Sequence, residues 1–222
     1  MKLSENTLAI LKNYANINTG IVLKPGKVVE TVNQSSTLRS FANISETIPV
    51  VFGIYDLTTF LANVSQLGGK DVNIQFDDHK LVLSNESGFS LDYYGAEPQL
   101  IKHPTKEIIE ITPDVEFTIH NQHFDKMLKL ASLNSFKNFS FVGEDDGLYV
   151  KVFNVVDGNA VSNSGKFRIG DNPNGVFEAR FLVENMKYLP LDYNVKLNHE
   201  GVAEFKSMDD NITYVTVMQE TE

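Results

Sequence analysis

The order of apolar and polar residues along this chain of 222 residues occurs twice, and this repeat restricts the fold more than any other feature. At 52–60 and again at 177–186, a strand-like stretch leads directly into a short helical pattern. A meander of alternating apolar and polar residues follows each of them, at 72–83 and at 193–205, as in half-buried strands. The repeat therefore predicts two similar α+β domains.

A proline-containing segment separates the two copies of the pattern. Residues 95–113 contain Pro98, Pro104 and Pro113, which is typical of an extended connector. We therefore expect a first domain at 1–107 and a second domain at 108–222, each with two helices packed on antiparallel sheet.

Four segments have the apolar spacing of an amphipathic helix. They are 2–17, 56–67, 121–133 and the shorter 183–189. Between them, alternating runs flank turn-forming residues and predict antiparallel hairpins. The expected hairpins are 20–23 with 27–32, 72–76 with 80–84, 139–142 with 148–154, and 194–198 with 203–207.

The composition excludes several classes of protein. The chain has no cysteine, so disulfides, thiolate zinc sites, iron–sulfur clusters and cysteine nucleophiles are ruled out. No apolar run approaches the roughly 20 residues of a membrane helix, and the first residues lack a signal-peptide core. We therefore expect a cytoplasmic protein that does not contact membranes.

The net charge of −10 argues against a protein that grips nucleic acid over its whole surface. The charges are unevenly distributed, however. Acidic residues crowd the expected turns and the C-terminus: Asp77, Asp78, Glu144, Asp145, Asp146, Asp209, Asp210, Glu220 and Glu222. The polar sides of the expected helices carry lysines instead: Lys2, Lys12, Lys126, Lys129 and Lys187. Such lysines indicate either a weak, sequence-independent DNA contact or an ordinary solvated helix face.

No enzyme motif is complete. His120 and His123 have helical i, i+3 spacing but lack a convincing third metal ligand. Gly68-Gly69-Lys70-Asp71 lacks the spacing and the hydroxyl residue of a phosphate-binding P-loop. The acidic pairs at 145–146 and 209–210 are typical of turns. We expect no catalytic site, no metal and no cofactor.

Four segments resemble a known family. Met1–Ile21, with Met-Lys-Leu-Ser-x-x-Thr-x-Ala-Ile-Leu-Lys-Asn-Tyr-Ala, is similar to the N-terminus of the sliding clamps of T-even-type bacteriophages. Shorter matches are Tyr55–Leu61, Asn185–Lys187 and Tyr214–Met218, so the resemblance spans both expected domains. It does not extend to 34–51 or 158–176.

The resemblance implies the DNA-clamp fold and a closed homotrimeric ring with helices around the hole. Such a ring encircles duplex DNA without sequence preference and tethers the replicative DNA polymerase. An ATP-dependent clamp loader places it on DNA, and the clamp binds a C-terminal peptide of the polymerase. In these phages it can also engage transcription proteins, all in the cytoplasm of the bacterial host at the replication fork.

The resemblance also implies roles for individual residues. The resemblance places Lys12, Lys129 and Lys187 among the DNA-facing residues, and we add Lys2 and Lys126 as their neighbours on the same helical faces. An apolar pocket for the partner peptide would draw on Leu38, Ile111, Val215 and Val217. The alternative that we keep open is a β-rich structural or assembly protein of a virion that never contacts DNA.

Overall fold

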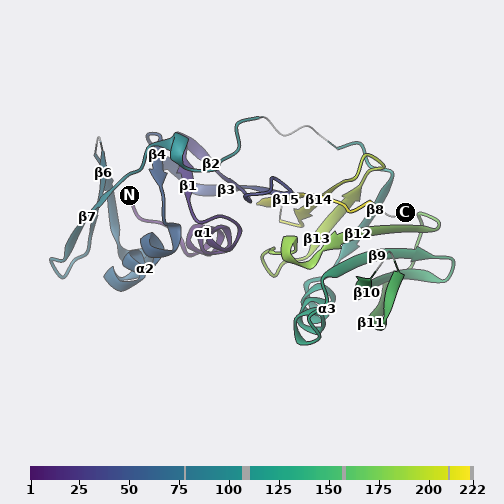
Figure 1. The fold of residues 1–222 in the computed structure, drawn as a ribbon. Helices are drawn as coiled ribbons and strands as arrows, with labels where there is room; N and C mark the ends of the chain where they lie inside the picture. Colours follow the sequence, from purple (N-terminus) through teal and green to yellow (C-terminus); the bar gives the residue numbers. More distant parts are fainter. Residues whose placement is uncertain (78, 107–110, 157–158, 210, 221–222) are drawn as a thin grey trace. The chain divides into compact units, whose positions relative to one another are not determined.

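The chain forms two compact units, Met1–Glu107 and Ile108–Glu222 (Figure 1). The computed structural model describes residues 1–77, 79–106, 111–156, 159–209 and 211–220. Asp78, Asp210, Glu222 and residues 107–110 of the expected connector therefore lie outside the described residues. Each unit is an α+β structure, as the repeat in the sequence predicted.

In the first unit, two α-helices lie side by side on one side of the strands (Figure 1). They are α1 (Glu5–Ile17) and α2 (Leu57–Leu67), and the short 3-10 helices are η1 (Gly69–Asp71) and η2 (Pro98–Leu100). The strands are β1 (Ile21–Leu23), β2 (Gly26–Val32), β3 (Leu38–Ile48), β4 (Phe52–Ile54), β5 (Asn73–Phe76), β6 (Lys80–Ser84) and β7 (Ser90–Tyr94). All the pairs β1–β4, β2–β3, β5–β6 and β6–β7 are antiparallel.

The second unit has one α-helix, α3 (Asn121–Leu133), and one 3-10 helix, η3 (Val183–Asn185). Its strands are β8 (Val115–Ile119), β9 (Asn138–Glu144), β10 (Gly147–Val156), β11 (Asn159–Gly170), β12 (Phe177–Leu182), β13 (Tyr193–Leu197), β14 (Val202–Ser207) and β15 (Ile212–Val217). They form two antiparallel sheets, one in the order β11-β10-β9-β12 and the other with β15, β14, β13 and β8 as neighbours.

The two units repeat one topology. In both, a helix is followed by four strands, then a helix or helical turn, then a three-strand meander. The strand before α3, β8, pairs with β13, and in the first unit Met1 makes the equivalent contact with β5. The backbone N–H of Ile74 donates to the Met1 carbonyl at 2.7 Å, and the Met1 amino group donates back to the Ile74 carbonyl. The duplication seen in the sequence is therefore a duplication of the fold.

The fourth expected helix, 183–189, is wrong. Only Val183–Asn185 forms a single 3-10 turn, at the position that α2 occupies in the first unit. Seven residues ending at a proline are too short for a stable isolated helix, which needs about 12 to 15 residues. The backbone is instead held from outside, because the N–H of Val183 donates to the Lys137 carbonyl and the N–H of Leu189 donates to the Tyr214 hydroxyl.

The first expected hairpin is also wrong, since β1 pairs with β4 and β2 pairs with β3. All residues of β1 and β4 are buried, so each strand is covered on both faces, and this shared burial explains why β1 pairs with β4. The sequence pattern showed only the local turn at Pro25-Gly26, which suggested a pairing with the next strand. The other three hairpins are confirmed as β5–β6, β9–β10 and β13–β14.

An aromatic cluster fills the core of the second unit. The rings of Phe141, Phe181 and Phe205 lie about 6 Å apart, and those of Tyr188 and Tyr214 stack at 4.4 Å. Such pairs add roughly 0.5–1.5 kcal/mol each beyond the burial of their area. Because the cluster draws on β9, β12, β14 and β15, it fixes both sheets and the segment after η3.

Candidate nucleic-acid interface

The start of α1 is fixed by a local cap and by a distant carboxylate. The Ser4 hydroxyl accepts the N–H of Thr7 at 3.2 Å, as an N-cap does. Glu46, at the end of β3, accepts the Ser4 N–H and the Thr7 hydroxyl, the latter at 2.6 Å. Burial alone would raise the pKa of Glu46, but these hydrogen bonds outweigh it and hold the pKa below its ordinary value.

One side of α1 is exposed and carries the first predicted lysines. Leu8, Leu11 and Tyr14 face the core, and the exposed residues recur at helical spacing: Glu5, Asn6, Ala9, Lys12 and Asn16. Lys2 is exposed just before the helix and lies 4.0 Å from the exposed Glu86. Within the described residues Lys12 has no ion-pair partner. Asn13, although polar, is buried.

The exposed side of α2 is uncharged. Asp56 caps the helix by accepting the Thr59 N–H at 2.8 Å, and the outward residues are Thr58, Thr59, Ala62, Ser65 and Gln66. Just beyond it, Lys70 pairs with Glu5 of α1 at 2.6 Å. Sequence reasoning considered Lys70 only as part of a phosphate loop and missed its place on this helical surface.

Two predicted lysines are exposed on α3, and both have local partners. The Lys126 ammonium lies 4.5 Å from the centre of the Phe167 ring on β11, in cation–π contact. Lys129 pairs with Asp125 one turn earlier at 2.5 Å. These partners leave the ammonium groups at the surface, where a phosphate can compete for them.

Lys187 is exposed in the segment after η3, as predicted, although this segment is not an α-helix. Lys137, which follows α3, is also exposed, and its carbonyl accepts the Val183 N–H at the start of η3. Lys137 was missed because no helical pattern includes it. The sequence does contain a signal that identifies Lys137, because this lysine follows a helical segment and comes directly before a buried strand.

The predicted DNA-facing residues thus fall into two groups, each on the helical side of its own unit. Lys2 and Lys12 belong to the first unit, and Lys126, Lys129 and Lys187 belong to the second. All five are exposed. Such lysines can contact phosphates, but neither arginines nor aromatic side chains accompany them on the exposed helical faces for base readout or stacking. This chemistry suits a weak contact with the nucleic-acid backbone.

The predicted peptide-pocket residues occupy different environments. Leu38 opens β3 and is buried on the inner side, because it shares a strand face with Ser40, whose hydroxyl contacts the Tyr14 hydroxyl of α1 at 3.0 Å. Val215 and Val217 lie on the outer face of β15, opposite Glu204 and Val202, and Val217 is 45% exposed. Ile111 is buried just after 107–110. Their joint role as a pocket stays a prediction.

The residues weighed for enzymatic chemistry have structural contacts. His120 and Asn121 both donate to Asp192, and Asp209 accepts from Ser207 and from Asn211 within its own turn. Across the described ranges, no group of three or more His, Asp or Glu side chains is arranged to hold a metal ion. None of the described helices is long and apolar enough to cross a membrane.

Comparison with known proteins matches these features to one family. Residues 2–109 match the family model described as DNA polymerase processivity factor. The sliding clamp of Escherichia phage RB69 is 27% identical, and that of Enterobacteria phage T4 is 26% identical. Each alignment covers 99% of this chain and 97% of the relative.

The fold is also that of known clamps. The structure matches the PCNA2-PCNA3 complex from Sulfolobus tokodaii with a TM-score of 0.71 at 10% identity, over 96% of this chain and 95% of that chain. At this identity the match concerns the fold alone, and it confirms the expected clamp architecture. With the relatives aligned over 97% of their length, the chain is similar to phage sliding clamps throughout and, at residues 2–109, to the DNA polymerase processivity factors.

Proposed function

We propose that three copies of this chain close into a ring around duplex DNA and tether the replicative DNA polymerase to it. The main support is the alignment with phage sliding clamps over 99% of the chain. The repeated clamp unit, with exposed lysines on the helical side of each copy, supports the same function. The comparisons favour this function over a virion component.

The charge distribution suits retention by enclosure. A net charge of −10 per chain repels DNA from most of the surface, while a few lysines give a weak, salt-sensitive attraction to phosphates. Tight phosphate contacts would slow sliding. Lys2, Lys12, Lys126, Lys129 and Lys187 are the residues we propose to face the DNA.

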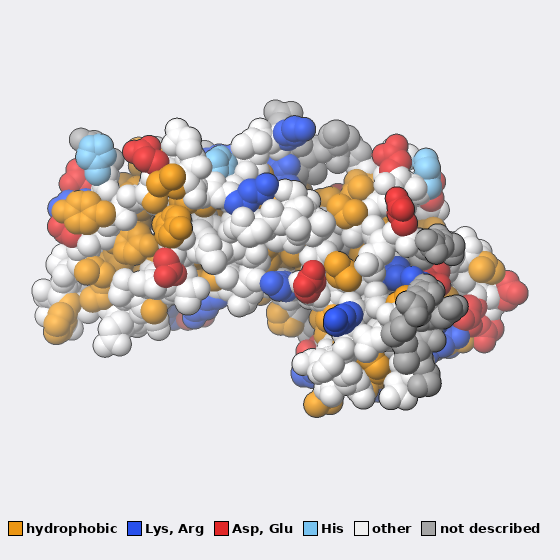
Figure 2. All heavy atoms as spheres, in the orientation of Figure 1, with side chains coloured by type: hydrophobic (Ala, Val, Ile, Leu, Met, Phe, Trp, Pro, Cys, Tyr) orange, Lys and Arg blue, Asp and Glu red, His pale blue; other side chains and the backbone are white. Residues whose placement is uncertain are grey.

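Ring closure can use two strand edges. In the described sheets, β7 is the edge of β5-β6-β7 and β11 is the edge of β11-β10-β9-β12. At the two ends of β7, Phe89 is 67% exposed and Tyr94 is 70% exposed, and hydrophobic side chains gather over this part of the first unit (Figure 2). Exposed edges and apolar side chains favour strand addition from another chain. We therefore propose that β7 of one protomer pairs with β11 of the next.

The remaining partners follow from the family. An ATP-dependent clamp loader opens the ring and places it on DNA, and a C-terminal polymerase peptide docks on an apolar pocket that draws on Leu38, Ile111, Val215 and Val217. Phage transcription proteins are further partners. The chain itself has no catalytic role and needs no cofactor, and it works in the cytoplasm of the bacterial host at the replication fork.

The test combines mass and topology. Three chains of 24.9 kDa give a particle of about 75 kDa by light scattering. Long primer extension by the cognate polymerase should increase only when loader and ATP are present, and the protein should be lost from cut linear DNA faster than from closed circles. Equal loss from both templates would exclude threading, and a particle without threefold symmetry would support the virion alternative.

A further inference from the structure

The outer face of the β2–β3 hairpin carries an unusual combination of side chains. Glu30 lies opposite Phe41, and Val32 lies opposite Arg39, so these side chains share one face of the hairpin. The other face, with Val29 and Ser40, packs under α1. On the outer face Val28 is 46% exposed and Phe41 is half-buried. The hairpin therefore presents charged and apolar groups together, outside the core of the first unit.

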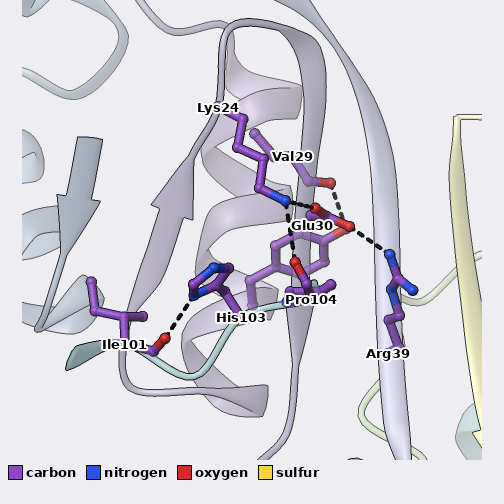
Figure 3. Close-up of polar contacts among 8 residues, drawn as sticks. Lys24, Val29, Glu30, Arg39, Ile101, His103 and Pro104 are labelled. Carbon is purple, nitrogen blue, oxygen red and sulfur yellow. Dashed lines mark hydrogen bonds and ion pairs between the residues drawn. The ribbon is translucent and has the colours of Figure 1, made fainter. Parts of the chain in front are cut away.

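Glu30 is shared between two cations on this face (Figure 3). Its carboxylate accepts from Lys24 Nζ at 2.5 Å and from Arg39 Nη2 at 2.8 Å. Lys24 also donates to the carbonyl of Pro104 at 3.2 Å, so the same ammonium holds the connector against the hairpin. The side chains of Lys24, Arg39 and Glu30 are 42%, 20% and 15% exposed, respectively.

The charge of this cluster is unbalanced. Two positive side chains share one carboxylate, and Arg39 Nε is buried without a hydrogen-bond partner among the described residues. Burial alone would raise the pKa of Glu30, but the hydrogen bonds from Lys24 and Arg39 hold it below its ordinary value. Glu30 is therefore ionised and pairs with both Lys24 and Arg39. The three side chains together carry one net positive charge, which can attract an external anion.

We propose that Lys24 and Arg39 form a docking site for an acidic, extended segment of a partner protein, with Glu30 as the internal carboxylate that this segment displaces. Val28 and Phe41 supply apolar contacts on the same face. This inference rests on the proposed function, since it assigns a second recognition element to the clamp's protein partners. Lys24 donates both to Glu30 and to the Pro104 carbonyl, so displacement of Glu30 would free one of the two acceptors of the ammonium that holds the connector.

A protein partner fits this face better than nucleic acid does. Arg39 is mostly buried in a single partly closed site, whereas backbone contacts to DNA use protruding cations that follow the phosphates. The exposed Val28 and the half-buried Phe41 have no complement on a sugar–phosphate chain. A peptide with alternating acidic and apolar residues complements both the charge and the apolar surface.

The test is an anisotropy titration of the full-length chain with two labelled synthetic peptides. One peptide alternates Asp or Glu with Leu, and the other replaces each acid by its amide. Wild type is compared with E30Q, K24Q, the double variant K24Q/R39Q, and the matched control K80Q, which removes a lysine that pairs with Asp92 at 2.7 Å elsewhere in the unit. Urea midpoints establish that each variant is folded.

We expect K24Q/R39Q to weaken binding of the acidic peptide about tenfold, as the loss of charged hydrogen bonds does, and K24Q alone to weaken it less. E30Q should strengthen binding several-fold, because the internal competitor is gone, and K80Q should have no effect. The amide peptide should bind weakly and equally to all variants. A merely structural role for the cluster predicts weaker binding in E30Q as well, and that result would overturn the proposal.

A labelled DNA duplex is titrated in parallel. If it gives the same order of affinities among the variants, the face is a nucleic-acid surface and the proposal is wrong. Primer extension with the same preparations separates this inference from the clamp function. A chain that stimulates extension but shows no preference for the acidic peptide contradicts only the docking site, whereas failure of wild type to form a ring or stimulate extension contradicts the clamp function itself.

Discussion

The carboxylate of Asp192 accepts the backbone N–H of Asn121 at 2.7 Å and thereby caps α3 from 71 residues away. His120, at the N-cap position, makes no capping hydrogen bond through its side chain and instead donates from its ring to the same carboxylate. The helix that carries Lys126 and Lys129 is therefore oriented by the segment after η3. In the first unit the corresponding cap, Ser4, is local.

Replacing Asp192 by alanine should destabilise the second unit by about 1 kcal/mol, the usual cost of a lost N-cap. The backbone N–H of Asn121, followed by His120, lowers the pKa of Asp192, so the stabilisation is present at neutral pH. It is lost as the pH falls from the ordinary carboxyl value through the lowered one. Urea unfolding at pH 7 measures the effect, with D145A in an exposed turn as control. Equal midpoints for wild type and D192A would contradict it.

His199 and Asp114 form an exposed pair whose titration is directly measurable. The ring Nδ1 and the backbone N–H of His199 both contact Asp114 Oδ2, at 2.8 and 2.6 Å. The hydrogen bond to Asp114 raises the pKa of His199, and the same contact lowers the pKa of Asp114. The stabilisation by protonated His199 is therefore complete below the ordinary histidine pKa and is lost as the pH rises through the raised value.

Proton NMR titration should show the His199 resonances moving at a pH above the ordinary histidine value. D114N should return the pKa of His199 toward that value, while E200Q, which removes a smaller contribution to the raised pKa, should shift it much less. A titration of His199 that is the same in D114N and wild type would show that the pair is not formed in solution.

Removing the lysines that we propose to face the DNA should shorten the retention of the protein on DNA. K12Q/K129Q/K187Q should be lost from closed circular DNA several-fold faster than wild type at about 0.15 M salt, with a shallower dependence on salt because fewer counterions are released. K151Q/K196Q/K206Q changes the net charge equally at lysines of β10, β13 and β14, away from the proposed β7–β11 ring interface, and it serves as the control. If the two triple variants were lost from closed circular DNA at the same rate, the DNA would contact residues other than Lys12, Lys129 and Lys187.

A proline in the middle of β7 should separate the protomers without unfolding the first unit. The N–H of Gly95 donates toward β6, at the His79 carbonyl, so by alternation the N–H of Asp92 points to the open edge. D92P removes that outward donor, and D92N removes only the ion pair with Lys80. Light scattering should show monomers for D92P and trimers for D92N. A trimer of folded D92P would mean that β7 is not the ring interface.

The parts of the fold that the sequence alone predicted depend on local contacts. The stripe of Leu8, Leu11 and Tyr14 predicts α1, because residues three and four apart share a helix face. Turns such as Glu144–Gly147 predict hairpins, because the two strands are neighbours in the chain. The repeat of these local patterns predicted two similar domains, and the exposed lysines on α1 and α3 follow from the same periodicity.

Only the tertiary structure determined the contacts between residues that are distant in the chain. It paired β1 with β4, reduced 183–189 to a single turn held by Lys137 and Tyr214, and capped α3 with Asp192. It also joined Lys24, Glu30 and Arg39 beside Pro104, although nothing in their spacing indicates a cluster. Local periodicity specifies which side of an element is buried. The partner that covers that side is selected by packing over the whole unit, and the sequence pattern of a single segment does not contain that information.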